Sequence, residues 1–189
     1  ERDYFEIYHL SILKEYIKKN AVIIDIGANI GNHTIFFAKE CNARKVYTFE
    51  PTFKTFQILK ENIRINRIDQ IVIPMNVALG SKDSNVEIIV DASDAGSNRV
   101  EENMRGDTVM NKLDSLSIHD RIDFIKIDVE GYEYEVLMGA EQTIIKDKPD
   151  IFIEIFDVNY DKVHSLLSRL GYECIERMEQ DYLYAPTRH

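Results

Sequence analysis

Short apolar runs alternate with amphipathic stretches along most of this chain. The runs are rich in β-branched residues and have the length of buried strands. The expected strands are 22–27, 45–50, 71–79, 86–90, 124–130 and 151–155. Apolar residues recur at helical spacing between most of them, and glycine or proline marks several boundaries. The expected helices are 3–19, 31–40, a segment that begins near Pro51, 132–145 and 159–169.

This alternation predicts a doubly wound α/β fold with about seven strands. The last two strands, 172–178 and 181–185, have no helix between them, so we expect an antiparallel hairpin at the sheet edge. Two helices should each bury one apolar stripe against the sheet. The stripes are Ile7, Leu10, Leu13 and Ile17 in the first helix, and Phe53, Phe56, Leu59 and Ile63 in the third.

Residues 83–110 interrupt the alternation. A short strand is followed by the polar stretch 91–108, which contains Gly96 and Gly106. A substrate lid and a disordered surface excursion both fit this composition. Because the chain shows no repeat and no linker, we expect 1–189 to form a single domain, with 1–20 as an N-terminal helix and 83–110 as an insertion.

The charge balance narrows the class of partner. The chain has 189 residues, a net charge of −10 and no long basic run. Proteins that bind nucleic acid present basic stripes to the phosphate backbone, so nucleic acid is not the expected partner. A hydrophobic content of 44% is ordinary for a globular protein.

Cysteine usage and hydropathy suggest a cytoplasmic protein. Cys41 and Cys174 lie far apart and form no Cys-x-x-Cys pair, so we expect two reduced thiols rather than a disulfide or a metal site. We find no apolar run of membrane-spanning length and no signal peptide. The sequence begins at Glu1 rather than Met, which allows for an excised domain or a processed form.

A glycine turn after the first strand is the strongest local signal. Gly27 and Gly31 follow the apolar run, and Asn29 stands between them. Glycine lets the backbone turn sharply and approach a ligand, and Asn tolerates the left-handed conformation. The pattern differs from the dinucleotide fingerprint G-x-G-x-x-G. The following helix start could hold an anion through its free N–H groups.

Two further strands end in acidic residues. Glu50 closes the second strand, where a carboxylate can accept hydrogen bonds from both hydroxyls of a ribose. Lys126, Asp128 and Glu130 alternate with apolar residues at the end of a central strand. Charges at such a position are costly unless they pair or serve a ligand, so we favour a ligand site over a plain surface ladder.

In this context the chain resembles the FkbM-type S-adenosylmethionine-dependent methyltransferases. The motifs that carry the resemblance are Asp25–Gly31, Phe49–Pro51, Asn76–Gly80, Lys126–Gly131 and Val136–Ala140, in that order. The resemblance extends over about residues 20–156. It implies a class I methyltransferase fold, which is a Rossmann-like seven-stranded mixed sheet with helices on both faces and an antiparallel last strand. It also implies S-adenosyl-L-methionine as cofactor and O-methylation of a sugar, polyketide, lipid or related metabolite.

The resemblance also assigns residues to the cofactor. Its methionine part would lie against Gly27, Ala28, Asn29 and Gly31, its ribose against Glu50, and its adenine beside Asn76 and Ala78. Asp25 and Pro51, at the ends of two of these motifs, and Asn32, which follows Gly31, are also included in the expected cofactor site. Asp128 would lie at the boundary between cofactor and substrate. The Asn32-His33 pair and Arg99 depart from the family pattern and could tune the substrate.

A hydroxyl acceptor benefits from a base that takes its proton. Glu130 and Asp128 are the first candidates, because neighbouring carboxylates push one pKa upward. Glu154 is the third, and Lys126 could orient or neutralise it. His33 could be a base, although a residue of the turn or helix surface is the simpler interpretation. An oxygen-ligand metal site at Asp128, Glu154 and Asp157 is a weaker alternative, and we assign no metal.

Two other classes of protein remain as alternatives. A nicotinamide-dependent oxidoreductase is disfavoured by the missing G-x-G-x-x-G and by the absence of a Tyr-x-x-x-Lys pair. A non-catalytic module of the same fold is disfavoured by the acids at 128 and 130.

Overall fold

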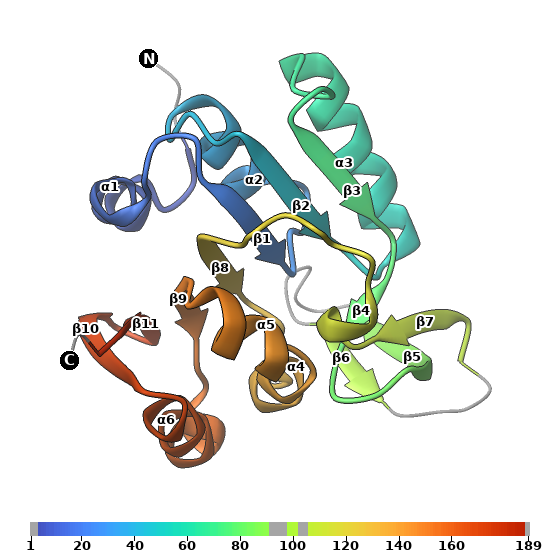
Figure 1. Cartoon of the computed structure of the whole chain (residues 1–189). Coiled ribbons are helices and arrows are strands. Elements are labelled where there is room, and N and C mark those ends of the chain that lie inside the picture. The colour runs from blue at the N-terminus through green and yellow to red at the C-terminus, as the bar shows by residue number, and fades with distance from the viewer. Residues whose placement is uncertain (1–3, 91–97, 102–105, 188–189) are drawn as a thin grey trace.

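A computed structural model describes residues 4–90, 98–101 and 106–187 of the chain. Its main sheet has seven strands in the order β10-β11-β9-β8-β1-β2-β3 (Figure 1). These strands are β1 (Val22–Ile26), β2 (Lys45–Phe49), β3 (Val72–Met75), β8 (Phe124–Ile127), β9 (Asp150–Glu154), β10 (Tyr172–Met178) and β11 (Asp181–Pro186). The expected seven-stranded α/β sheet is thereby confirmed.

The pairing directions match the expected topology. β3, β2, β1, β8 and β9 pair in parallel, whereas β11 runs antiparallel to both β9 and β10. The predicted terminal hairpin therefore lies at the sheet edge. Because all five parallel strands end at the same edge, that carboxyl edge collects the residues that follow them.

Helices cover both faces of the main sheet. One face carries α1 (Ile7–Tyr16), α2 (Asn32–Lys39) and α3 (Phe53–Asn66), and the other carries α4 (Glu133–Gly139), α5 (Glu141–Asp147) and α6 (Tyr160–Arg169) (Figure 1). The alternation along β1 explains the division, because neighbouring side chains of a strand point to opposite faces. Ile23 packs with the first group of helices, and Ile24 packs with the second.

The segment predicted as one strand over 71–79 is two strands in different sheets. β3 ends at Met75, and β4 (Ala78–Leu79) joins a second sheet of order β4-β7-β5-β6. The other members are β5 (Ser84–Val90), β6 (Asn98–Glu101) and β7 (Thr108–Asn111). Part of the insertion is thus a folded sheet beside α4 (Figure 1). Residues 91–97 and 102–105, which include Gly96, lie outside the described residues.

Other helix predictions needed correction. Ile7 and Phe53, expected in apolar stripes, are 49% and 66% exposed, because each lies at the first residue of its helix. The expected helix 132–145 is divided at Ala140, which leaves the helical conformation (φ −112°, ψ 5°). Two short 3-10 helices, Leu113–Ser115 and Asp157–Asn159, complete the regular structure of the described residues.

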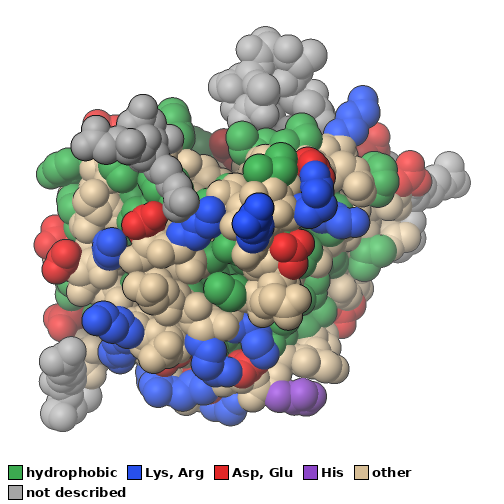
Figure 2. Space-filling view, turned by 90° about the horizontal axis from the view of Figure 1, so that it is seen from above, with side chains coloured by type: hydrophobic (Ala, Val, Ile, Leu, Met, Phe, Trp, Pro, Cys, Tyr) green, Lys and Arg blue, Asp and Glu red, His purple; other side chains and the backbone are tan. Residues whose placement is uncertain are grey.

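Charge is unevenly distributed over the molecule. On the face shown in Figure 2, Lys and Arg outweigh Asp and Glu and gather toward its lower edge. The whole chain has 33 acidic and 23 basic residues, so the acidic excess lies elsewhere. Among the described residues, no helix is long and apolar enough to span a bilayer.

Candidate active site

The glycine turn joins β1 to α2 at the carboxyl edge. Gly27 has φ 74°, and its N–H and that of Ala28 both donate to the Phe49 carbonyl at 3.0 Å. A Cβ at Gly27 would lie 1.7 Å from the Asp128 carbonyl oxygen, so only glycine fits between the two strand ends. Asn29 has φ 49°, which confirms that it takes the left-handed conformation in place of a glycine.

Glu50 is fixed directly beside this turn. One carboxylate oxygen accepts the Asn29 N–H at 3.0 Å, and the other accepts the Thr52 N–H at 2.8 Å. Burial raises the pKa of Glu50, and these backbone donors oppose the increase. A carboxylate oxygen can accept more than one hydrogen bond, so both oxygens keep capacity for ligand hydroxyls.

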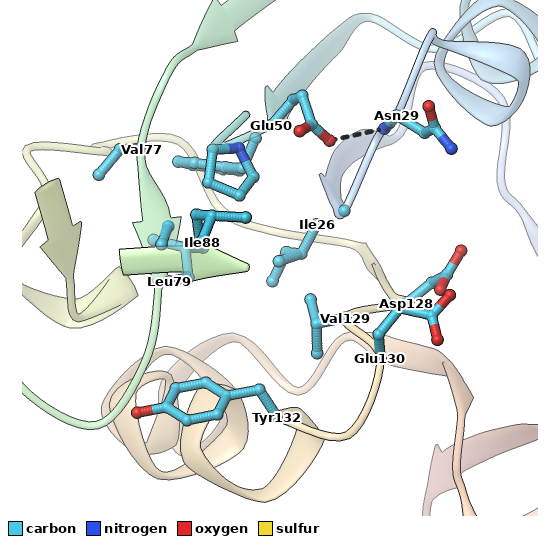
Figure 3. Close-up of a pocket in the computed structure, with 14 residues that line it drawn as sticks. Ile26, Asn29, Glu50, Val77, Leu79, Ile88, Asp128, Val129, Glu130 and Tyr132 are labelled. Atoms are coloured by element: carbon cyan, nitrogen blue, oxygen red, sulfur yellow. Dashed lines mark hydrogen bonds between the residues drawn. The ribbon is translucent and has the colours of Figure 1, made fainter. Parts of the chain in front are cut away.

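A pocket opens between Glu50 and the second sheet (Figure 3). It has a volume of about 750 Å³, open solvent included. One side is apolar, and the other side presents the glycine turn and three carboxylates. The lining residues are Ile26, Gly27, Asn29, Phe49, Glu50, Pro51, Val77, Ala78, Leu79, Ile88, Asp128, Val129, Glu130 and Tyr132. An apolar slot beside a fixed carboxylate suits a flat base joined to a sugar.

A buried ammonium group, that of Lys126, contacts the residues on the acidic side of the pocket. Lys126 is 3% exposed, and its Nζ donates to the Gly27 carbonyl at 3.0 Å and to Asp128 Oδ2 at 3.1 Å. Asp25 Oδ1 lies 3.6 Å from the same Nζ. Burial alone would lower the pKa of Lys126, but Asp128 and Asp25 raise it, so the side chain is a cation. Lys126 therefore ties the turn to Asp128.

Asp128 and Glu154 form a coupled pair at the ends of β8 and β9. Burial alone would raise the pKa of Asp128, but Lys126 and a hydrogen bond with Glu154 lower it. Burial and the charge of Asp128 raise the pKa of Glu154 to about 8. Near neutral pH the pair thus holds one proton, on Glu154. In Figure 3 the carboxylates of Asp128 and Glu130 point away from the apolar part of the pocket.

Several residues expected in the cofactor site do not line the pocket. Asp25 is completely buried and accepts a hydrogen bond from Thr34 Oγ1 at 2.5 Å, so it supports the turn from inside the sheet. Asn76 is exposed and donates to the carbonyls of Glu50 and Pro51 at 2.8 and 2.9 Å.

Three further residues expected in the cofactor site, Ala28, Gly31 and Asn32, lie around the glycine turn and do not line the pocket either. Ala28 and Gly31 are buried in the turn, and Gly31 has φ 97°. Asn32 is engaged by the N-terminal segment: it accepts the Phe5 N–H at 3.1 Å and donates to the Phe5 carbonyl at 3.0 Å. Arg99 lies on β6, where its backbone is opposite Ile89.

Sequence reasoning missed two groups of residues. The apolar wall of the pocket comes from sequence-distant segments whose apolar residues look like ordinary core. Its members are Phe49, Val77, Leu79, Ile88 and Tyr132. Phe49, Val77 and Leu79 lie inside the family motifs but were not assigned to the site, and no motif contains Ile88 or Tyr132. The second group is His9 and Asp181, whose Nδ1 and Oδ2 lie 3.1 Å apart at the same sheet edge. The sequence predicted the terminal hairpin at the sheet edge but not its pairing with β9, and that pairing is what places Asp181 opposite Glu154.

The structure gives little geometric support for the alternative metal site at Asp128, Glu154 and Asp157. Within the described residues, no group of three or more His, Cys, Asp or Glu side chains is arranged to hold a metal ion. Asp157 is exposed in the 3-10 helix after β9. The geometry of the carboxylate pair is already explained by Lys126 and the shared proton.

The order of the main sheet, its antiparallel final hairpin and the glycine turn define the class I methyltransferase fold. The chain belongs to the FkbM methyltransferase domain family, whose sequence model matches residues 25–174. The resemblance seen in the motifs is therefore confirmed at the level of the family.

One curated relative is the hexuronic acid methyltransferase AglP of Haloferax volcanii. It is 31% identical over 139 residues, which make up 71% of this chain and 56% of that protein. The chain thus spans a little over half the length of the curated relative that it matches.

Two solved structures illustrate the shared fold. The crystal structure of methyltransferase FkbM from Methylobacillus flagellatus has a TM-score of 0.65 and 22% identity, covering 88% of this chain and 43% of that chain. An rRNA methylase from Streptococcus thermophilus has a TM-score of 0.61 and 12% identity, covering 95% of each chain. At such low sequence identities, these two similarities show that the fold is shared and nothing more.

Proposed function

We propose that this chain is an S-adenosyl-L-methionine-dependent methyltransferase that methylates a sugar hydroxyl. The observation that carries the proposal is the position of Glu50, which the turn fixes at the entrance of an apolar slot. On the far side of the turn, Asp128 and Glu154 form a carboxylate pair that holds one proton. Cofactor recognition and proton acceptance are thus served by two adjoining groups of residues.

The residues present fit the cofactor. Glu50 would accept hydrogen bonds from the ribose hydroxyls, while Val77, Leu79 and Ile88 would enclose the adenine. Gly27 would let the methionine part approach the backbone. When bound, the cofactor supplies an electrophilic methyl group, so the protein's main task is alignment of the acceptor oxygen.

The carboxylate pair would serve the acceptor. A group that takes a proton from a hydroxyl works best when its pKa lies near the working pH. Glu154, with a pKa of about 8, would act in its deprotonated form, which becomes more populated as the pH approaches 8. Asp128 would orient the hydroxyl, and Lys126 would keep Asp128 charged and in place. Glu130 lines the same pocket and remains a candidate base.

The relative from Haloferax volcanii directs the substrate proposal toward sugars. A hexuronic acid offers two kinds of acceptor oxygen, hydroxyls and a carboxylate. A carboxylate would need no base and would be repelled by Asp128, whereas a hydroxyl would use the pair. We therefore favour a hydroxyl and an ether product.

The test is methyl transfer from isotopically labelled S-adenosylmethionine to a panel of glycosides, followed by treatment of the product with mild alkali. We expect label in a product that survives alkali, since an ether is stable and a carboxyl ester is hydrolysed. Release of the label by alkali would show carboxyl methylation, and the absence of label from every glycoside would contradict the sugar proposal.

A further inference from the structure

His33 carries a buried ring nitrogen without a hydrogen-bond partner. It lies in the first turn of α2, is 9% exposed, and its Nε2 has no partner within the described part of the chain. Glu6 Oε2 lies 3.9 Å from this nitrogen, beyond hydrogen-bond range. Burial and the charge of Lys126 lower the pKa of His33 to about 3, so the ring is neutral.

The N-terminal segment brings other polar groups to the same place. The two hydrogen bonds between Asn32 and the Phe5 backbone hold this segment on the start of α2. His9 then reaches Asp181 at 3.1 Å, and Asp181 is opposite Glu154 in the β9–β11 register. Four elements, α1, α2, β9 and β11, therefore contribute polar side chains to one end of the sheet.

These groups lie close enough to affect one another. Burial raises the pKa of Asp181 to about 6; His9 opposes this increase, and Glu6 and Asp128 add to it. The charge of Asp128 also acts to raise the pKa of His33, and His9 acts to lower it. Asp128 also lines the proposed cofactor pocket, so this cluster adjoins that pocket at the carboxylate proposed to orient the acceptor hydroxyl.

We propose that His33, His9, Asp181 and Glu154 form the acceptor site, and that His33 Nε2 makes a hydrogen bond with a sugar hydroxyl there. The inference rests on the proposed function. A buried polar atom without a partner is costly, and a bound hydroxyl would satisfy it. Glu6, Asp128 and Asp181 make the surroundings acidic, so the part of the sugar that enters presents neutral hydroxyls, and any carboxylate lies outside.

The first test compares His33→Ala and His33→Gln with the exposed-site control His119→Ala, using 4-nitrophenyl β-D-glucoside and 4-nitrophenyl β-D-glucuronide as acceptors. Loss of one hydrogen bond should raise the KM for the acceptor about tenfold in His33→Ala. The Gln amide should recover part of this loss, and the control should match the wild type. An unchanged KM in His33→Ala would overturn the proposal.

Affinity for S-adenosylhomocysteine separates this inference from the proposed function. The His33 variants should bind it within about twofold of wild type, because they alter only the acceptor side. If the wild type does not bind S-adenosylhomocysteine, the proposed function fails. If the wild type binds it but methylates neither glycoside, the sugar-site inference fails while the cofactor assignment stands.

A binding measurement on the wild-type protein avoids any effect of substitution on folding. With S-adenosylhomocysteine at saturation, the NMR ring signals of His33, assigned by comparison with His33→Gln, should shift when the glucoside is added. The glucoside should bind at least as tightly as the glucuronide. A lack of shift with both glycosides, or tighter binding of the glucuronide, would contradict the inference.

Discussion

Lys126 Nζ donates a hydrogen bond to Asp128 Oδ2 at 3.1 Å, across the boundary between the protein core and the pocket. Lys126 is 3% exposed, whereas the Asp128 side chain is 34% exposed. The same Nζ also bonds to the Gly27 carbonyl at 3.0 Å. A single buried cation thus fixes the glycine turn and the proposed acceptor side relative to each other.

Lys126→Met should destabilise the protein strongly. The variant would leave Asp25, which is completely buried, without its cation, and breaking a buried ion pair in this way costs about 3–5 kcal/mol of unfolding free energy. Urea unfolding would measure the loss, with the exposed-site variant Lys18→Met as control. A loss below about 1 kcal/mol would show that the network does not stabilise the fold.

Gly27→Ala and Gly131→Ala should differ in severity although both positions have positive φ. At Gly27 the new Cβ would meet the Asp128 carbonyl at 1.7 Å, whereas at Gly131 nothing lies within 4 Å. Backbone strain alone costs of order 1 kcal/mol, so Gly131→Ala should lose about that much. Gly27→Ala should lose several times more in urea unfolding. Equal losses would argue against the close contact between the turn and β8.

Glu154 should make the folded state less stable as pH increases. Its pKa is about 8 in the folded protein and near 4.5 when unfolded, so between these values the folded state holds a proton that the unfolded state has lost. Its contribution to the unfolding free energy is therefore present below about pH 4.5 and lost by about pH 8.

Glu154→Gln should remove that dependence. Relative to wild type, the variant should gain stability between pH 5 and pH 8, while the exposed-site control Glu173→Gln should follow the wild type. Urea unfolding at the two pH values gives the comparison. If Glu154→Gln and wild type change in parallel, Glu154 titrates normally and is unsuited to the proposed proton transfer.

The sequence predicted the main sheet, its terminal hairpin and the glycine turn because these features depend on local patterns. Apolar runs and glycine boundaries located the strands of the main sheet, and the absence of a helix between 172–178 and 181–185 revealed the hairpin. Asn29 and Glu50 were identified because a turn and a strand end have recognisable chemistry, and both line the pocket.

The features of the fold and the site that the sequence did not predict depend on tertiary contacts. The division of 71–79 into β3 and β4 follows from pairing between Ala78 and Met110, which no local pattern records. His33 was expected on the turn or helix surface, as a possible base or a residue that tunes the substrate. Its burial could not be predicted, because the N-terminal residues that Asn32 holds are brought to it only by the tertiary fold. Ile88 lies in the predicted strand 86–90, but no local pattern shows that the insertion brings this strand to the pocket.

The assignment of the pocket to the cofactor is the central claim, and calorimetric titration with S-adenosylhomocysteine tests it most directly. We predict saturable binding at one site for the wild type, binding about tenfold weaker for Glu50→Gln because a charged acceptor is lost, and no binding of NAD. The exposed-site variant Glu61→Gln should bind as the wild type does. Binding of NAD in place of S-adenosylhomocysteine, or equal affinities for wild type and Glu50→Gln, would contradict the account.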